Sequence, residues 1–351
     1  MRAFDKVNHN LMCSKLKAAG VDGCYLKWFK DFLSDRWQYV EYGSAGSSLV
    51  PATSGIIQGS CAGPSLFNVY INDLVKVVKH CNLVLFADDL KAVGEVASTE
   101  SAALVQCDLD AIEDWSIKNK LPISLPKCSV MHYGAKNAKR SYTLSGQSIA
   151  RVNKCIDLGI TRSDTFTYSN HIHGIAMRAS RLAGMVLKVF STRDAKFLTK
   201  VFCAYIRPIL EYASPVWSSQ DAESRVLLEN VQRRYTKRIA GLRDQTYEER
   251  LAALKLQSLQ HRRLYSDLLL AFKSLHSFTV EPEALGLRLS NTNSTRSYGR
   301  RFVHCKPNTS CLAKSYMCRL PVEWDRLPSR IRLASTISAF KKFVFNHLSS
   351  Q

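Results

Sequence analysis

Hydrophobic positions follow two different patterns along the chain. In the first half, glycine, proline and polar residues interrupt short apolar runs. This pattern predicts short strands and core helices that are joined by loops. From Ile172 to Phe190, apolar residues recur at steps of three and four, which predicts an amphipathic helix. The chain is therefore expected to combine α and β structure first and to become helical afterwards.

Further helices are predicted beyond Phe190. Ser191 and Asp194 resemble a capping box before an apolar stripe that runs to Ile206. Pro208 lacks a backbone donor, so a kink or break is expected near Arg207. Another helix is predicted over residues 222–240. Its inward-facing residues are expected to be Leu227, Leu228, Val231, Tyr235 and Ile239.

The remaining C-terminal sequence carries less information. Residues 290–315 are rich in Ser, Thr, Asn and Arg, which predicts a loop or linker. A final helix is predicted over residues 337–348. These segments are expected to serve packing or the docking of a partner. They predict no catalytic chemistry.

An acidic pair interrupts one apolar run. Leu83 to Phe86 predicts a buried strand, and Asp88 and Asp89 follow where apolar residues would otherwise continue. Two adjacent carboxylates repel each other unless a cation joins them, and Mg²⁺ prefers such oxygen ligands. Two metal ions held by aspartates can serve phosphoryl transfer, although an isolated Asp-Asp more often marks an acidic turn.

A glycine-containing block precedes this pair. Residues 54–67 predict a loop that leads into a helix over residues 66–74. Gly55 and Gly59 flank Gln58, and glycines permit close approach of a nucleotide to the backbone. Asp73 is expected to be a capping or surface group.

Composition narrows the class of partner. The 351 residues carry a net charge of +20, which favours nucleic acid first and an anionic membrane second. The sequence shows neither an 18-residue apolar stretch nor a secretory signal, and the eleven scattered cysteines indicate reduced thiols. An intracellular protein of the nucleus or cytoplasm, not associated with a membrane, is expected. A zinc site is disfavoured because four residues near the C-terminus fit no Cys-x-x-Cys spacing: His304, Cys305, Cys311 and Cys318.

One predicted helix carries a basic cluster. Its members are Arg233, Arg234, Lys237 and Arg238. Such a face can follow the backbone of a nucleic-acid duplex, with binding that weakens as salt rises. The alternative is an ordinary solvated helix surface.

Several ordered blocks resemble the reverse transcriptases of non-LTR (LINE-type) retrotransposons. They are Ala3-Phe4-Asp5-Lys6-Val7, Gly55-Ile56-Ile57-Gln58-Gly59, Tyr70-Ile71-Asn72-Asp73-Leu74, Phe86-Ala87-Asp88-Asp89, the lysine block 121–128 and the turn 157–160. The resemblance implies an α+β polymerase palm with a small antiparallel sheet over residues 1–160. A helical thumb over 161–275 and a C-terminal region of unknown role over 276–351 would follow.

The resemblance also implies a set of site residues. Asp88 would bind two Mg²⁺ ions with Asp89 as the second ligand. Phe4 would lie beneath the incoming sugar, and Gln58 and Gly59 would contact the nucleotide and template. Lys127 would protonate the leaving pyrophosphate. The implied partners are an RNA template, a DNA primer and deoxynucleoside triphosphates.

The chain also departs from the family pattern. The family's first metal carboxylate lies four positions before the alanine, which falls before Met1, so an N-terminally truncated, catalytically impaired fragment without fingers is expected. Asp5 is not expected to replace that carboxylate. Ile57 replaces the usual proline, and Pro126 immediately precedes Lys127. Two alternatives stay open: a non-catalytic nucleic-acid-binding remnant of a reverse transcriptase, and a relative of RNA-splicing maturases.

Overall fold

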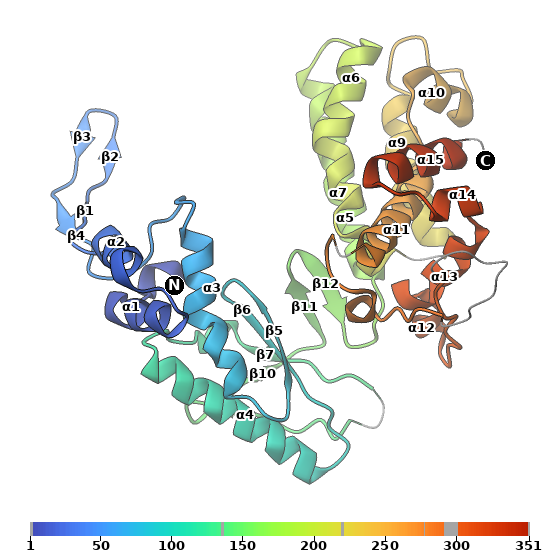
Figure 1. The fold of residues 1–351 in the computed structure, drawn as a ribbon. Coiled ribbons are helices and arrows are strands. Elements are labelled where there is room, and N and C mark those ends of the chain that lie inside the picture. Colours follow the sequence, from blue (N-terminus) through green and yellow to red (C-terminus); the bar gives the residue numbers. More distant parts are fainter. Residues whose placement is uncertain (1–2, 135–136, 219–220, 277, 291–300, 350–351) are drawn as a thin grey trace. The chain divides into compact units, whose positions relative to one another are not determined.

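The computed structural model describes residues 3–134, 137–218, 221–276, 278–290 and 301–349. The chain divides into two compact units, Met1–Asn153 and Lys154–Gln351, called here the N-terminal and C-terminal units. Figure 1 shows the helices and strands of each unit.

The N-terminal unit contains four helices and ten short strands among its described residues. The helices are α1 His9–Ala18, α2 Gly23–Leu33, α3 Gly63–Ile71 and α4 Thr99–Lys118. The strands are β1 Trp37–Gln38, β2 Glu41–Tyr42, β3 Ala45–Gly46, β4 Val50–Pro51, β5 Asn82–Phe86, β6 Asp89–Val93, β7 Ser129–Val130, β8 Thr143–Leu144, β9 Gln147–Ser148 and β10 Ala150–Arg151. Short 3₁₀ turns span Ala3–Lys6, Asn72–Lys76 and Leu125–Lys127.

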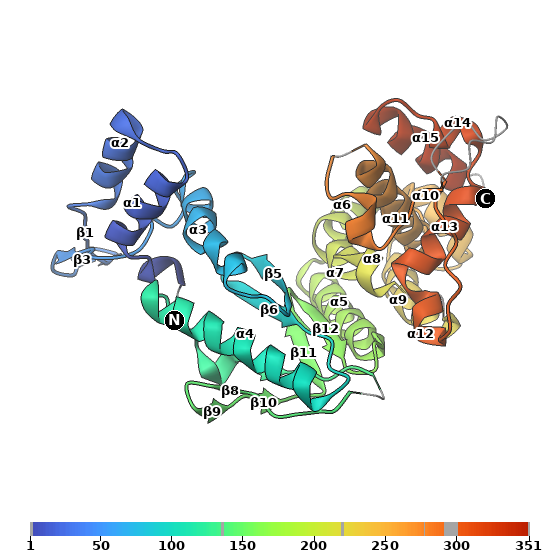
Figure 2. The ribbon, with the colours of Figure 1, turned by 60° about the horizontal axis from the view of Figure 1, so that its bottom comes forward.

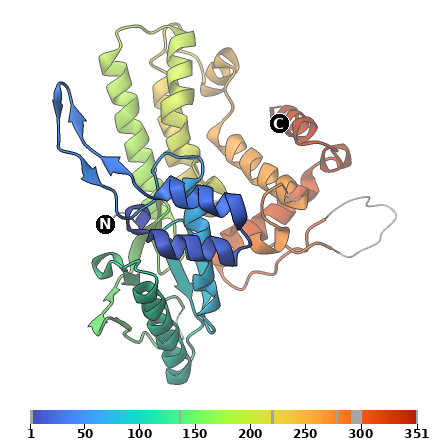
Figure 3. The same cartoon turned by 60° about the vertical axis from the view of Figure 1, so that its left-hand side comes forward.

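Each of these strands pairs with one other strand, so the sheets are two-stranded. The β5–β6 hairpin is the longest, with antiparallel register from Asn82–Val93 to Phe86–Asp89. The pairs β1–β4 and β2–β3 form a narrow ribbon that projects from the neighbouring helices (Figure 3). β7 and β10 are parallel, while β8 and β9 are antiparallel.

The core of the N-terminal unit forms around α3. Leu66, Phe67 and Tyr70 are buried together with residues of α1 and α4. The Tyr70 hydroxyl donates a hydrogen bond to the Asn119 carbonyl just after α4, over 2.5 Å. The β8–β9 hairpin lies along α4, as Figure 2 shows. The expected helix over 66–74 is therefore present, divided into α3 and the 3₁₀ turn Asn72–Lys76.

The C-terminal unit is mainly helical. It begins with the hairpin of β11 Lys154–Asp157 and β12 Ile160–Ser163. The helices are α5 Ser169–Val189, α6 Ala195–Val201, α7 Arg207–Glu211, α8 Ser214–Trp217, α9 Ala222–Thr236, α10 Tyr247–Leu254, α11 Leu259–Leu275, α12 Ser310–Lys314, α13 Tyr316–Arg326, α14 Ser329–Arg332 and α15 Ile337–Ser349. A 3₁₀ turn spans Pro282–Leu285.

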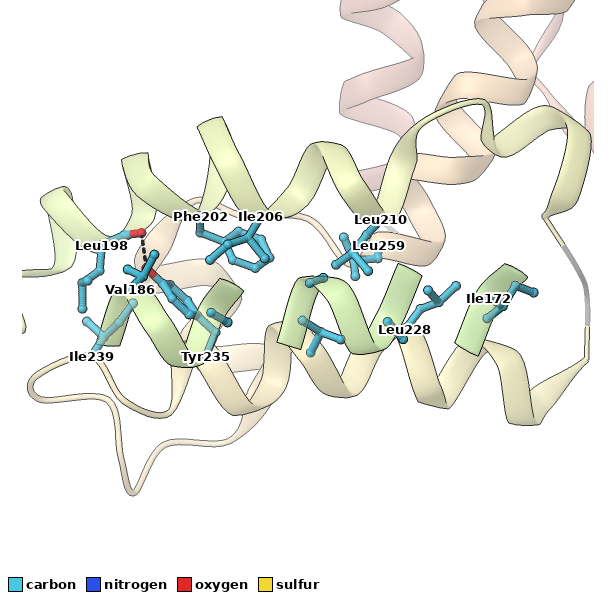
Figure 4. Close-up of a cluster of buried hydrophobic side chains, with 14 of the residues drawn as sticks. Ile172, Val186, Leu198, Phe202, Ile206, Leu210, Leu228, Tyr235, Ile239 and Leu259 are labelled. Atoms are coloured by element: carbon cyan, nitrogen blue, oxygen red, sulfur yellow. Dashed lines mark hydrogen bonds between the residues drawn. The ribbon is translucent and has the colours of Figure 1, made fainter. Parts of the chain in front are cut away.

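Figure 4 shows the first hydrophobic core of this unit, which α5, α6, α7 and α9 share. The predicted helix over 172–190 is confirmed as α5, whose buried face includes Ile172, Ala176 and Val186. Tyr235 packs on Phe202 and donates a hydrogen bond to the Leu198 carbonyl over 2.9 Å. The predicted helix over 222–240 is shorter than expected, because α9 ends at Thr236.

One local prediction in this region was wrong. Asp194 is itself the N-cap of α6 and accepts from the Phe197 N–H, so the Ser191–Asp194 capping box does not form. Of the kink or break expected near Arg207, the break does not occur. Instead, a π-helical turn over Phe202–Ile206 joins α6 to α7, placing Pro208 in the first turn of α7, where its missing donor costs little.

A second core joins α11 to the C-terminal helices α13, α14 and α15. Trp324 is fully buried, with Phe302 and Phe340 against its ring. Phe272 of α11 stacks on Phe340 of α15 with ring centroids 4.1 Å apart. The C-terminal region therefore shares a core with α11, and the predicted final helix is confirmed as α15.

The predicted loop over 290–315 is confirmed only in part. Residues 291–300 lie outside the described residues, and Phe302 forms an isolated bridge with Leu289. The prediction was wrong from Ser310 onward, where Thr309 caps α12 by accepting from the Leu312 N–H. Taken together, helices and small, mostly antiparallel sheets confirm the α+β class in its general form.

Candidate functional site

The acidic pair lies at the tip of the β5–β6 hairpin. Phe86 and Asp89 form the last strand pair, so Ala87 and Asp88 make the turn between them. Ala87 has a φ of 49°, a left-handed conformation that is uncommon for alanine. The predicted strand before the acidic pair is confirmed as β5, but the expected burial was wrong, because Val84 and Phe86 are 50% and 62% exposed. The tight turn places Asp88 at the exposed end of the hairpin.

The glycine-containing loop lies against the 3₁₀ turn Ala3–Lys6. The Gly55 N–H donates to the Val7 carbonyl over 2.8 Å, and the Ile56 N–H donates to the Phe4 carbonyl over 2.9 Å. Gly55 has a φ of 90°, and a Cβ there would lie only 2.8 Å from the Asp5 Cα. Glycine is therefore required at this position for the loop to reach residues 4–7.

The same loop then turns into α3. Gly59 has a φ of 81°, and the Ser60 hydroxyl donates to the Ile57 carbonyl over 2.7 Å. The Ser60 Oγ also accepts from the Gly63 N–H over 3.1 Å. These two hydrogen bonds hold the loop at the first turn of α3, where Pro64 lacks a donor that the helix does not need.

Asp5 binds the glutamine of this loop. The Gln58 Nε2 donates to the Asp5 Oδ1 over 2.6 Å, and the Ser54 hydroxyl donates to the Asp5 backbone carbonyl over 2.8 Å. The two elements are thus joined by a side-chain contact as well as by the backbone. Sequence reasoning missed this role of Asp5, because no local pattern connects residues 53 positions apart.

A pocket of about 470 Å³ opens between these elements. It is lined by Ala3, Phe4, Ile57, Gln58, Gly59, Ser60, Gly63, Pro64 and Asp88. Phe4 is fixed by stacking on Phe67, with ring centroids 4.4 Å apart and planes inclined by 12°. The structure therefore brings together four of the residues named from the sequence, namely Phe4, Gln58, Gly59 and Asp88.

Two other residues that the sequence analysis assigned to the site do not line this pocket. Asp89 is exposed and is the first residue of β6, next to Asp88. Lys127 is exposed at the end of the 3₁₀ turn Leu125–Lys127. Their expected roles as second metal ligand and proton donor stay predictions.

The carboxylates of Asp88 and Asp89 suit a hard cation. Both are exposed, and neither makes a hydrogen bond or ion pair with another described residue. Carboxylate oxygens with space for water and phosphate are the usual ligands of Mg²⁺. Within the described part of the chain, no group of three or more His, Cys, Asp or Glu residues converges on a possible metal position.

Asp108 anchors the segment that leads into β5. This α4 carboxylate is buried and accepts hydrogen bonds from the backbone N–H groups of Lys79, His80 and Cys81, at 3.0, 2.8 and 2.6 Å. Burial by itself would raise the pKa of Asp108, but these hydrogen bonds outweigh it and lower that pKa below its ordinary value. The segment that leads into the β5–β6 hairpin, whose turn carries Asp88, is thus tied to α4 through a charged group.

The basic cluster is exposed at the end of α9. Arg233 and Arg234 lie in the last helical turn, and Lys237 and Arg238 follow it. The Arg233 guanidinium lies over the Tyr247 ring, 4.7 Å from its centroid. The other three side chains make no hydrogen bond or ion pair with the described residues, so their charges are available to a polyanion.

None of the helices among the described residues is long and apolar enough to cross a membrane.

Comparison with known proteins identifies the N-terminal part of the chain. Residues 1–172 match the family described as reverse transcriptase (RNA-dependent DNA polymerase). In Drosophila melanogaster, the chain is 26% identical over 228 residues to a putative 115 kDa protein in type-1 retrotransposable element R1DM. That match covers 61% of this chain and 21% of the relative.

Two further relatives from the same organism agree with this match. The chain is 25% identical over 333 residues to the RNA-directed DNA polymerase from mobile element jockey, covering 88% of this chain and 35% of the relative. It is 24% identical over 230 residues to the probable RNA-directed DNA polymerase from transposon X-element, covering 61% and 25%.

The chain thus spans between about a fifth and about a third of the length of these curated relatives. The family match covers the 3₁₀ turn with Phe4, the loop with Gln58 and the hairpin with Asp88. The predicted resemblance is confirmed: residues 1–172 belong to the reverse transcriptase family, and the chain is similar to proteins of non-LTR, LINE-type retrotransposons.

Proposed function

We propose that this chain carries the palm and thumb of an RNA-directed DNA polymerase, and that the 470 Å³ pocket receives the incoming deoxynucleotide. The single observation that carries the proposal is the convergence of Phe4, Gln58, Gly59 and Asp88 on one pocket. These residues come from three segments that lie far apart in the sequence. Their convergence matches the roles implied by the family.

Each pocket residue has a task in this proposal. The Phe4 ring, held against Phe67, forms a rigid wall beneath the sugar and leaves little space for a 2′-hydroxyl. Because Gln58 donates its Nε2 hydrogen bond to Asp5, its Oε1 is free to accept from the nucleotide. Gly59 lets the nucleotide approach the loop backbone closely.

The two exposed aspartates supply the electrostatic part of the site. Asp88 and Asp89 would hold Mg²⁺, and the ions would neutralise charge on the transferred phosphoryl group when bound. Of the two aspartates, Asp88 is the one that a nucleotide in the pocket would meet directly, because it lines the pocket. Lys127 is proposed to give a proton to the pyrophosphate as it leaves.

The basic cluster supplies the contact with a template–primer duplex in this proposal. Arg234, Lys237 and Arg238 expose charges that no described residue neutralises. A helical thumb that follows the backbone of an RNA–DNA hybrid needs such charges but no recognition of base edges.

The decisive experiment compares Asp88→Asn with Asp114→Asn. Asp114 is an exposed aspartate of α4 that does not line the pocket. We would measure Mg²⁺-dependent binding of a deoxynucleoside triphosphate to the chain on an RNA–DNA template–primer, together with primer extension. The proposal predicts a loss in Asp88→Asn alone. Equal behaviour of both variants would reject the pocket as the nucleotide site.

The exposed basic cluster also supports a second function, which is nucleic-acid binding without turnover. This function predicts a salt-dependent affinity for the heteroduplex that Asp88→Asn leaves unchanged, and no extension at saturating nucleotide and Mg²⁺. Extension that depends on Asp88 would exclude it.

A further inference from the structure

Arg36 lies between α2 and β1, at the base of the projecting ribbon (Figure 1). Its backbone carbonyl accepts a hydrogen bond from the Ala52 N–H over 2.8 Å, which closes the ribbon directly after β4. The chain then continues through Ser54 into the glycine-containing loop. Arg36 is therefore a neighbour of this loop, although it does not line the proposed nucleotide pocket.

The Arg36 side chain is half-buried and donates hydrogen bonds to two backbone carbonyls. Its Nη2 donates to the Gly55 carbonyl over 2.9 Å, and its Nε donates to the Leu33 carbonyl at the end of α2 over 3.1 Å. The guanidinium is planar and holds its donors in a fixed geometry. One side chain thus ties the glycine-containing loop to α2.

His9, the first residue of α1, reaches the same carbonyl oxygen. Its Nε2 lies 2.9 Å from the Gly55 oxygen, which can only accept, so this nitrogen carries a proton. The His9 Nε2 and the Arg36 Nη2 are 3.4 Å apart and, as two donors, do not bond each other. The two lone pairs of the Gly55 oxygen accept one hydrogen bond from each. Because Arg36 remains charged, its hydrogen bond is charge-assisted.

These contacts hold one peptide unit of the loop from both sides. Two donors bind the Gly55 carbonyl, and the N–H of the same peptide unit, that of Ile56, donates to the Phe4 carbonyl over 2.9 Å. Gly55 is buried, so its carbonyl would be costly to leave without partners. Gln58 and Gly59 follow three and four residues later. The orientation of this peptide unit therefore sets the direction in which the loop enters the pocket.

We propose that Arg36 is a positioning residue, which holds the glycine-containing loop in the conformation that presents Gln58 and Gly59 to the pocket. The inference rests on the proposed function of that pocket. Arg36 acts through the Gly55 carbonyl and does not line the pocket itself. Arginine suits this task because one planar group reaches both the loop and the end of α2, whereas lysine offers a single ammonium on a flexible stem.

The test measures binding of a deoxynucleoside triphosphate to the chain on an RNA–DNA template–primer with Mg²⁺. Arg36→Met removes both hydrogen bonds, and Arg36→Lys keeps a charged donor for one carbonyl. Arg151→Met is the matched control, because Arg151 is an exposed residue of β10 that does not line the pocket. We expect about tenfold weaker binding in Arg36→Met, a smaller loss in Arg36→Lys and no change in Arg151→Met.

A double-mutant cycle with Gln58→Ala separates positioning from general stability. If Arg36 acts through the loop, Arg36→Met should cost less affinity in the Gln58→Ala background, because the side chain that the loop presents is already absent. The same fold-loss in both backgrounds would overturn the proposal. Binding by Arg36→Met that equals binding by the unmodified chain would also overturn it.

Hydrogen exchange of the Gly55 and Ile56 amides tests the inference without a nucleotide. Both amides should exchange faster in Arg36→Met than in the unmodified chain or in Arg151→Met, and unchanged exchange would overturn the proposal. Faster exchange in Arg36→Met, when the unmodified chain binds no nucleotide, would reject the proposed function of the pocket and still show that Arg36 holds the loop. If Arg36→Met does not fold, Arg36→Lys carries the same comparisons, with an expected loss of about threefold.

Discussion

Gln58 Nε2 lies 2.6 Å from Asp5 Oδ1, and this hydrogen bond joins the glycine-containing loop to the 3₁₀ turn that carries Phe4. It orients the glutamine amide at the edge of the proposed nucleotide pocket. Asp5 therefore positions another residue of the pocket and does not line the pocket itself.

Asp5→Ala removes the acceptor that orients Gln58. We expect a nucleotide affinity lower by about fivefold, which corresponds to about 1 kcal/mol for one hydrogen bond. Asp5→Asn keeps a side-chain carbonyl acceptor and should lose less. Nucleotide titrations of the chain on a template–primer provide the measurement. If both variants bind like the unmodified chain, Asp5 has no positioning role.

Phe4→Ala removes the aromatic wall of the pocket. We expect the preference for a deoxynucleotide over the matching ribonucleotide to fall, because space opens where the 2′-hydroxyl would lie. Competition between the two nucleotides for the same template–primer complex measures this preference. Deoxynucleotide binding is the internal control, and parallel losses for both nucleotides would indicate a collapsed pocket instead.

Asp108→Asn should destabilise the N-terminal unit by about 2 kcal/mol, because a carboxylate that accepts three backbone hydrogen bonds is replaced. The folded-state pKa of Asp108 is lowered, so its stabilising contribution is present above the unfolded-state pKa of about 3.9. That contribution is lost as pH falls through the lower folded-state pKa.

Urea denaturation of the unmodified chain and of Asp108→Asn from neutral to acidic pH measures this effect. The difference in unfolding free energy between the two should be largest above about pH 5 and should shrink in more acidic solution. The exposed Asp114→Asn is the control. A difference that is independent of pH would show that the charge of Asp108 is unimportant.

Arg319 and Asp267 form a buried ion pair between α13 and α11. The Arg319 Nε and Nη2 lie 3.0 and 3.1 Å from the two carboxylate oxygens, and both residues are nearly inaccessible. Arg319→Met leaves Asp267 buried without its partner, which should cost about 3–5 kcal/mol. In denaturant unfolding, Arg319→Met should lose far more unfolding free energy than Arg326→Met, in which the replaced arginine is exposed.

Replacing Arg234 and Lys237 by glutamine should weaken heteroduplex binding and reduce its salt dependence. Each lost phosphate contact lowers the slope of log affinity against log salt by about 0.9 on B-form DNA, and a hybrid should behave similarly. The control is the double variant Lys341→Gln with Lys342→Gln, which removes the same amount of positive charge at exposed positions of α15. Equal slopes for the two double variants would show that only net charge matters.

Local patterns determined several features of this protein. The apolar run before Asp88 is a strand, and the apolar spacing after Ile172 is the long helix α5. Both follow from contacts between residues near each other in sequence, which fix the alternation of a strand and the periodicity of a helix. The motif order also identified the family and four residues of the pocket.

Tertiary structure decided the features that depend on distant partners. The Asp5–Gln58 hydrogen bond and the contact of Arg36 with the Gly55 carbonyl require segments that the fold alone brings together. The local pattern likewise misplaced the cap of α6 and predicted a kink or break near Arg207, where the helix does not break. Packing of Leu198, Phe202 and Ile206 in one core instead keeps the chain helical through a π turn. Burial of these side chains outweighs the local preference to stop, and burial is a property of the whole fold.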